Sequence, residues 1–365
     1  MRIALIAPLV SLINEPQRGG SQVFVSDLAR GLVERGHHVD LYAATGSVVG
    51  GVNVIDTGVD HRALQSTLYR ASGTSARGTR VADAAFAGVY RAVRETGYDV
   101  VHNHAFDAPA VAQATELQAR VVHTLHLPPD VEIADALRRA ATTDDPPPAV
   151  VCVSTSQARA WRTLVAVDAV LPSLVPTQSI PFSPGAGRGA VFAGRFSPEK
   201  GAAEAIEIAS AAGIAIALFG DDYDSDYARA AIEPRGAEPG VVVSAGVPRM
   251  MLWEAMGRAS VVLCPANWEE PFGMVAAEAQ ACGTPVVAFR RGALAEVVLD
   301  GLTGFLISPG NIRGAADAVG RVPTLSRGEC RAHAERQLDL ERTLDAHERL
   351  YRRLVVAPSG TRVGS

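Results

Sequence analysis

The chain has 365 residues, of which 48% are hydrophobic and 20% are charged, and its formal net charge is −5. This length suits two domains of ordinary size, and the composition excludes a largely disordered chain. A negative net charge argues against a general nucleic-acid binder, which carries a basic excess. Four widely spaced cysteines show neither a zinc-site nor a disulfide pattern, which fits a reducing cytoplasm.

The first ten residues, 1–10, are mostly apolar and predict a buried strand rather than a signal peptide. Pro8 interrupts the apolar run, and no small-residue cleavage site follows before Asn14 and Glu15. No apolar stretch approaches the roughly 18 residues needed to span a bilayer. The sequence therefore predicts a cytoplasmic protein that is at most peripheral to a membrane.

Short runs rich in Val and Ile alternate with segments of helical period, a pattern typical of βα units in parallel sheets. A helix with Phe24, Leu28 and Leu32 on one face is predicted to end at Gly36. In the first half the predicted strands are Ile3–Ala7, Val39–Ala43, Asn53–Asp56, Asp99–His102, Val121–Leu125 and Val150–Ser154.

A Pro- and Gly-rich stretch, Pro172–Gly189, predicts a linker, after which the alternation resumes. We expect a doubly wound α/β protein with one Rossmann-like domain over 1–176 and a second over 177–339. The predicted strands of the second half are Ala190–Ala193, Ile214–Phe219, Val241–Ser244, Ser260–Cys264, Pro285–Phe289 and Gly304–Ile307, with helices from Gly201, through Trp253 and through Glu278.

The last periodic segment predicts one charged helix over about Glu335–Leu354. Its expected apolar contacts are Leu338, Leu344, Leu350 and Tyr351. The tail, residues 357–365, is predicted to be disordered.

Gly19 and Gly20 follow Arg18 between the first strand and the first helix. A Gly pair there allows backbone N–H groups to approach an anion at the helix N-terminus. A plain βα turn is the alternative interpretation. The pair is not the G-x-G-x-x-G dinucleotide fingerprint, which weakens the case for a dehydrogenase.

Two cations, Arg195 and Lys200, lie in the segment Gly194–Gly201 at the first strand-to-helix turn of the second half. Arg195 suits a bidentate contact with a diphosphate, and Lys200 a point charge. The alternative is that both are solvated surface residues. Their position between glycines at the carboxyl end of a strand favours the diphosphate.

Two carboxylates, Glu270 and Glu278, are separated by Pro-Phe-Gly-Met-Val-Ala-Ala. We expect a helix to open at Phe272-Gly273, so that Glu270 precedes it and Glu278 lies about two turns inside. Carboxylates suit sugar hydroxyls and a ribose diol because each accepts several hydroxyl hydrogen bonds. Ordinary surface acids are the alternative, but the small and apolar neighbours predict a buried helix.

These motifs resemble those of the large family of retaining glycosyltransferases with the two-domain GT-B fold, the fourth sequence family. The resemblance is strong over about Ala190–Pro309, where residues 301–309 also fit. It is weaker over the first half, where it is carried by Gly19-Gly20, by residues 35–39 and by residues 99–104.

The resemblance implies a nucleotide-diphosphate sugar as donor, bound in a cleft between the domains. Arg195 and Lys200 would hold its diphosphate, Glu278 its ribose, and Gly20 would close over the phosphate. Glu270 would hold the transferred sugar, and His104 would face it. The backbone that joins Glu270 in contacting the sugar and the distal phosphate would be that of Phe272, Gly273, Met274 and Val275. A C-terminal helix, about 340–356, would pack back on the N-terminal domain.

Two features depart from the family pattern. The linker around Val175 lacks the usual Asn-Gly turn, which leaves the local loop geometry open. Glu269 directly precedes Glu270, so a shift by one residue is not excluded, although the spacing to Glu278 favours Glu270.

The histidines allow two interpretations. His102 and His104 would share a face on a continuous strand, but a strand ending near His102 would leave His104 free in the loop. A core or capping histidine is the alternative. His123 and His126 would point to opposite faces of a strand, which argues against a metal site.

Two charged segments have weaker functional interpretations. The segment His61–Arg80 has Arg62, Arg70, Arg77 and Arg80 and no acid, which allows peripheral contact with anionic lipid or simply a solvated helix. The acidic run 221–226 resembles an Asp-x-Asp metal motif, but it more readily predicts a solvated turn with a helix cap.

The predicted activity is retaining, metal-independent transfer of a hexose to a hydroxyl of a small molecule, lipid or glycan. We expect UDP-sugar as donor, with GDP-mannose next. The alternatives are a sugar-nucleotide epimerase or a glycan phosphorylase of the same fold, and a non-catalytic nucleotide-sugar-binding regulator. The sequence leaves the acceptor and the oligomeric state open.

Overall fold

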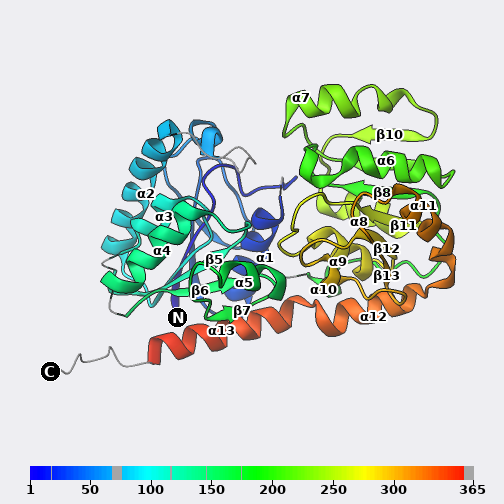
Figure 1. The fold of residues 1–365 in the computed structure, drawn as a ribbon. Coiled ribbons are helices and arrows are strands. Elements are labelled where there is room, and N and C mark those ends of the chain that lie inside the picture. Colours follow the sequence, from blue (N-terminus) through cyan, green and yellow to red (C-terminus); the bar gives the residue numbers. More distant parts are fainter. Residues whose placement is uncertain (18, 68–75, 116, 145, 174, 357–365) are drawn as a thin grey trace. The chain divides into compact units, whose positions relative to one another are not determined.

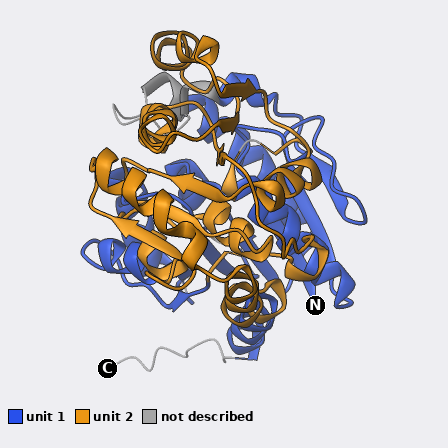
Figure 2. Ribbon diagram, turned by 90° about the vertical axis from the view of Figure 1, so that its right-hand side faces the viewer, with its two compact units in different colours: residues 1–14, 21–171, 343–365 blue, residues 15–20, 172–342 orange. Residues whose placement is uncertain are grey.

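The computed structural model describes residues 1–365 except 18, 68–75, 116, 145, 174 and 357–365. The predicted tail at 357–365 thus lies outside the described residues. The chain forms two compact units (Figure 2): unit 1 comprises residues 1–14, 21–171 and 343–365, and unit 2 comprises 15–20 and 172–342. Among the described residues, no helix is long and apolar enough to cross a bilayer.

Unit 1 contains a seven-stranded parallel sheet in the order β3-β2-β1-β4-β5-β6-β7, flanked by helices (Figure 1). Its strands are β1 (Arg2–Ile6), β2 (His38–Ala43), β3 (Asn53–Asp56), β4 (Val100–Asn103), β5 (Arg120–Leu125), β6 (Ala149–Cys152) and β7 (Ala169–Val170). Its helices are α1 (Gly20–Glu34), α2 (Ala76–Thr96), α3 (Ala108–Ala112), α4 (Val131–Thr143), α5 (Thr155–Trp161) and α13 (Leu340–Val356), with α1 and α13 beginning in unit 2.

Unit 2 contains a six-stranded parallel sheet in the order β10-β9-β8-β11-β12-β13. Its strands are β8 (Ala190–Ala193), β9 (Ile216–Phe219), β10 (Val241–Ser244), β11 (Val261–Cys264), β12 (Val286–Phe289) and β13 (Gly304–Ile307). Its helices are α6 (Ala202–Ala211), α7 (Ser225–Tyr227), α8 (Arg249–Arg258), α9 (Met274–Ala281), α10 (Leu294–Val297), α11 (Ile312–Arg321) and α12 (Arg327–Gln337).

The predicted α/β class with two Rossmann-like sheets is confirmed. In the first half, the predicted bounds of β1, β2, β4 and β5 are correct to within one residue at each end. The predicted bounds of β3, β8, β10 and β13 are correct at both ends. The first helix buries Phe24, Leu28 and Leu32 completely. Apolar runs between polar turns are reliable signals here because parallel strands are covered on both faces.

The predicted helical segment Glu335–Leu354 is divided between two helices, α12 and α13, and α13 has the bounds 340–356 expected for the C-terminal helix. Asp339 interrupts them: its Oδ1 accepts a hydrogen bond from Glu341 N at 3.0 Å, and its Oδ2 accepts one from Thr177. Leu340 N also donates a backbone hydrogen bond to Val175 O at 3.0 Å. The predicted apolar contacts Leu338, Leu344, Leu350 and Tyr351 are all buried.

Candidate functional site

The predicted site residues of unit 2 follow two adjacent strands at the centre of its sheet, β8 and β11. The chain order reverses at this point, since β9 and β10 extend to one side of β8 while β12 and β13 extend beyond β11. In open parallel sheets, ligands bind outside the carboxyl ends of the strands at such a switch point. Arg195 and Lys200 follow β8, and Glu270 follows β11.

Arg195 is held between a carboxylate and aromatic rings. Its Nε and Nη2 donate to Glu199 Oε1 at 2.9 and 2.7 Å, and its Cζ lies 4.4 Å from the centre of the Tyr223 ring. Burial raises the pKa of Glu199, but Arg195 and a hydrogen bond from Ser197 outweigh this, so that the net pKa lies below the usual value. Arg195 is therefore a fixed cation beside an ionised acid.

Lys200 contacts the carboxylate of Glu270. Lys200 Nζ lies 3.1 Å from Oε1 and 2.8 Å from Oε2. Trp268 joins this pair: its Nε1 donates to Glu270 Oε2 at 2.7 Å, and its ring centre lies 4.6 Å from Lys200 Nζ. A cation over an indole face is attracted by the ring quadrupole. The structure thus brings together two residues that the sequence placed 70 positions apart, and adds Trp268.

Gly201 explains why Lys200 reaches the loop after β11. Its φ is +77°, and a Cβ built there would lie 2.0 Å from the backbone oxygen of Pro265, the residue that follows β11. Only glycine allows this approach without a backbone shift. The close packing fixes the two loops of the switch point against each other.

The start of α9 presents backbone N–H groups beside Glu270. Met274 is the first helical residue, and the helix has no side-chain cap, so the N–H groups of its first turn lack intrahelical acceptors. Phe272 and Gly273 are buried directly before it, and Val275 is half-buried. The prediction that a buried helix opens at Phe272-Gly273 is confirmed, and such an N-terminus suits an anion.

Glu278 lies in the second turn of α9 and is 4% exposed. It pairs with Arg249, the first residue of α8, which is 8% exposed. Arg249 Nε donates to Glu278 Oε1 at 2.9 Å, and Nη2 lies 2.8 Å from the same oxygen. Sequence reasoning missed Arg249; the signal was an arginine directly before the apolar run 250–253.

The neighbouring acid Glu269 has a different environment from Glu270. Its carboxylate contacts Arg291 and accepts a hydrogen bond from Gly292 N at 2.8 Å, with a side chain 62% exposed. Glu270, by contrast, faces Lys200, so the geometry favours Glu270 for the predicted role. Burial raises the pKa of Cys264, at the end of β11, to about 12, so this thiol is not an activated nucleophile.

The predicted glycines at the end of the first βα connection are Gly19, which is half-buried, and Gly20, which is exposed. Both belong to unit 2, as does Met274. A Cβ built on Gly20 would lie 3.4 Å from Met274 Cγ. Gly20 therefore lies near the start of α9, whereas Arg18 lies outside the described residues.

His104 lies in the loop directly after β4, which ends at Asn103, but its side chain is buried rather than free. Its backbone N donates to Ile6 O at 2.9 Å, which continues the β1–β4 ladder by one residue and turns the side chain to the face of His102. The side chain is fully buried, with its ring centre 4.0 Å from that of His102, and its Nδ1 lies 3.1 Å from His126 Nε2. His104 Nε2 has no hydrogen-bond partner among the described residues.

The cluster around His104 also includes His102, His126 and His347 of α13. His102 Nδ1 lies 2.6 Å from Tyr351 Oη, and His102 Nε2 lies 2.7 Å from Thr124 Oγ1. Burial, with repulsion from the neighbouring histidines, holds the pKa values of His102 and His104 well below the usual range. Burial also lowers the pKa of His347 to about 4.

We expect the free energy of unfolding to fall as the pH drops from 7 to 5. These histidines are neutral in the folded protein but accept protons near pH 6.5 in the unfolded protein. The unfolded state therefore binds more protons, and a falling pH stabilises it relative to the folded state. His347 alone should account for about 2 kcal/mol at pH 5. Urea unfolding at both pH values measures this. His347→Leu should reduce the pH dependence; a variant with the same pH dependence as the wild type would contradict the assignment.

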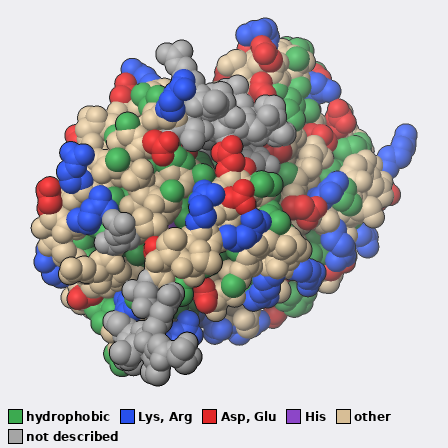
Figure 3. All heavy atoms as spheres, turned by 60° about the vertical axis from the view of Figure 1, so that its left-hand side comes forward, with side chains coloured by type: hydrophobic (Ala, Val, Ile, Leu, Met, Phe, Trp, Pro, Cys, Tyr) green, Lys and Arg blue, Asp and Glu red, His purple; other side chains and the backbone are tan. Residues whose placement is uncertain are grey.

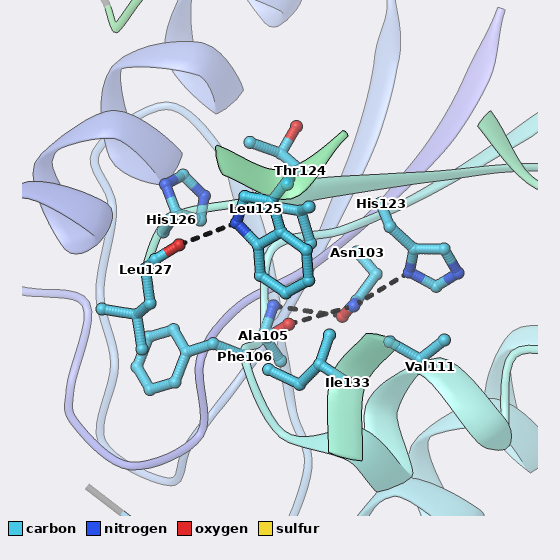
Figure 4. Close-up of a pocket in the computed structure, with 11 residues that line it drawn as sticks. Asn103, Ala105, Phe106, Val111, His123, Thr124, Leu125, His126, Leu127 and Ile133 are labelled. Carbon is cyan, nitrogen blue, oxygen red and sulfur yellow. Dashed lines mark hydrogen bonds between the residues drawn. The ribbon is translucent and has the colours of Figure 1, made fainter. Parts of the chain in front are cut away.

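A small pocket in unit 1 lies beside this cluster (Figure 4). Asn103 Nδ2 donates to His123 Nδ1 and to Ala105 O, both at 3.1 Å, and Trp161 Nε1 donates to Leu127 O at 3.0 Å. The bonds of Asn103 hold the loop after β4 in shape, and the bond from Trp161 holds the loop after β5. The pocket is lined by Asn103, Ala105, Phe106, Val111, His123, Thr124, Leu125, His126, Leu127, Ile133 and Trp161.

His123 and His126 contact different partners, as expected for opposite faces. Within the part of the chain that the structure describes, no three His, Cys, Asp or Glu side chains are grouped to hold a metal ion. In the acidic run, Asp224 Oδ1 accepts hydrogen bonds from Asp226 N and Tyr227 N at 3.1 and 3.0 Å. The predicted helix cap is confirmed.

The predicted basic segment 61–80 is only partly described. Arg62 and Arg80 are exposed, whereas Arg70 and the side chain of Arg77 lie outside the described residues. On the face shown in Figure 3, acidic and basic side chains are interspersed. Contact with a membrane therefore stays a prediction.

Comparisons with known proteins show which family the chain resembles. Residues 181–336 match the family model for glycosyl transferases group 1, and residues 18–178 match the model for glycosyltransferase family 4. The chain is 29% identical to a D-inositol 3-phosphate glycosyltransferase from Kribbella flavida, over 88% of this chain and 87% of the relative.

Two solved structures show the same fold. A sucrose-phosphate synthase from Thermosynechococcus elongatus has a TM-score of 0.75 and 20% identity and covers 97% of this chain and 98% of its own. HepE from Anabaena, in complex with UDP-glucose, has a TM-score of 0.72 and 20% identity. The match covers 96% of this chain and 99% of the HepE chain. Together the two family models span nearly the whole chain, which therefore belongs to the family 4 glycosyltransferases with the GT-B fold.

Proposed function

We propose that the chain transfers a hexose from a UDP-sugar to a hydroxyl acceptor with retention of the anomeric configuration. The observation that carries the proposal is the pairing of Lys200 with Glu270 beside Arg195 at the switch point of unit 2. Two cations suit a diphosphate, and an acid suits sugar hydroxyls. The complex of HepE with UDP-glucose supports uridine as the base.

In the proposed reaction, negative charge gathers on the diphosphate as the glycosidic bond breaks. Arg195, Lys200 and the N–H groups at the start of α9 offset this charge, as preorganised donors do in other enzymes. The acceptor oxygen then attacks the face that the diphosphate leaves, and the diphosphate takes up the proton of the hydroxyl. We propose a short-lived ion pair rather than a covalent intermediate, and no requirement for a divalent metal. For His104 the role toward the sugar implied by the resemblance stays a prediction.

Thermal unfolding with saturating UDP, GDP and ADP, in EDTA, tests the donor site. A ligand at about 100 times its dissociation constant stabilises the folded state by about 2.7 kcal/mol, a shift of several degrees. We expect the shift with UDP and its loss in Lys200→Ala. A shift with GDP alone would replace uridine by guanosine, and none with any nucleotide would contradict the proposal.

Product analysis tests the transfer itself. D-inositol 3-phosphate is the first acceptor to try, because the relative from Kribbella flavida carries that name. We expect a glycoside whose anomeric coupling in NMR matches that of the donor. An isomerised sugar nucleotide without acceptor would indicate an epimerase, and consumption of inorganic phosphate would indicate a phosphorylase.

Replacing Trp268 with phenylalanine should lower kcat/KM about tenfold. The ring over Lys200 is kept, but Glu270 loses the hydrogen bond from the indole N–H, and such bonds to charged groups contribute about 1.5 kcal/mol or more. Initial rates with UDP-sugar measure this, with thermal unfolding to verify an unchanged fold. Wild-type kcat/KM in a folded variant would show that Trp268 does not act through Glu270.

A further inference from the structure

The buried ion pair of Arg249 and Glu278 joins the first turn of α8 to the middle of α9. Nε and Nη2 of the guanidinium both contact the same oxygen, Glu278 Oε1, at 2.9 and 2.8 Å. The second oxygen, Oε2, therefore lies outside the contact with Arg249. A carboxylate with one oxygen tied and the other available accepts hydrogen bonds in a fixed direction.

Arg249 is itself held in place. Its guanidinium lies 4.9 Å from the centre of the ring of Trp253, four residues further along α8, and its side chain is 8% exposed. Arginine stays protonated in proteins, so this partner is always charged.

We propose that Arg249 is a positioning residue for the nucleotide. It turns Oε2 of Glu278 toward the vicinal diol of the donor's ribose, without touching the nucleotide. This inference rests on the proposed function and on the role of Glu278 that the resemblance implies. A purely structural pair would tie α8 to α9 and leave ribose recognition unchanged.

The test compares the affinity for UDP with that for 2′-deoxy-UDP by calorimetry. In the wild type we expect UDP to bind about tenfold more tightly, because the deoxy ligand leaves an acceptor of Glu278 unpaired. Arg249→Met should reduce the ratio of the two affinities to near one, chiefly by weakening the binding of UDP. A general packing defect would weaken both ligands equally and leave their ratio unchanged.

Four further variants make the test specific. Arg258→Met is the matched control, because Arg258 ends the same helix, is 78% exposed and pairs with Glu254; its ratio should equal that of the wild type. Glu278→Gln should lose the preference, and the double variant with Arg249→Met should lose no more. If Arg249→Met fails to fold, Arg249→Lys keeps the charge without the planar fork and should give an intermediate ratio.

The outcomes separate the two proposals. The inference would be overturned if an Arg249 variant kept the wild-type ratio of affinities for UDP and 2′-deoxy-UDP while Glu278→Gln lost the preference for UDP. A wild type that binds both ligands equally would also overturn it, since Glu278 would then not read the diol. A wild type and Arg258→Met that bind no UDP would instead overturn the proposed donor.

Discussion

Replacing Lys200 with alanine is expected to lower the rate of sugar transfer by about 10²-fold or more. Loss of one preorganised donor that stabilises developing charge has effects of this order. Lys200 also neutralises Glu270, so its removal leaves that carboxylate without its cation beside the diphosphate. Steady-state rates of UDP release with a saturating acceptor measure the effect.

The control for Lys200→Ala is Arg258→Ala, which removes an exposed cation of the same unit. Arg258 is 78% exposed and pairs only across one turn of α8 with Glu254. Its activity should be unchanged, because exposed i,i+4 pairs contribute little. Turnover like that of the wild type in Lys200→Ala would remove the assignment of this site to the diphosphate.

Replacing Gly292 with alanine should both destabilise unit 2 and abolish most of the activity. Gly292 follows β12, has φ +52°, and a Cβ there would lie 2.4 Å from Glu270 O and 2.5 Å from Glu270 N. Ala293 N also donates to Glu270 O at 2.8 Å. The added methyl must displace the Glu270 backbone, which carries the carboxylate that pairs with Lys200. We expect a loss of about 3 kcal/mol in the free energy of unfolding, together with a large fall in kcat.

Gly301→Ala separates backbone strain from steric overlap. Gly301 has φ +78°, but a Cβ there would meet nothing within 4 Å. This variant should lose about 1 kcal/mol and keep its activity. Thermal unfolding and kcat of both variants test the comparison; equal effects on kcat would show that the contact with Glu270 is not what matters.

Much of the fold could be predicted from the sequence because both sheets are parallel and covered on both faces. Their strands therefore stand out as apolar runs, as at β8 and β13. The two-residue strand β7 gave no such signal. The break between α12 and α13 was missed because it depends on contacts of Asp339 with Val175 and Thr177, which lie more than 160 residues earlier.

The candidate site was predicted in part. Arg195, Lys200 and Glu270 could be grouped because each follows a central strand, and the carboxyl ends of such strands share one edge. The partners Trp268 and Arg249 were not predicted, since their roles arise from side-chain contacts within folded loops and helices. The sequence left open whether the side chain of His104 is free or buried, because one further hydrogen bond beyond the end of β4 decides this.

The ion pairs at the switch point bear on how quickly a donor would be captured. Arg195 with Glu199, Lys200 with Glu270, and Arg249 with Glu278 each sum to zero charge. An anionic nucleotide approaching these residues therefore meets dipoles of short range rather than a net positive field. Long-range steering would be weak, so the association rate should vary little with ionic strength. Selectivity among nucleotides would then reside in how slowly the correct one dissociates.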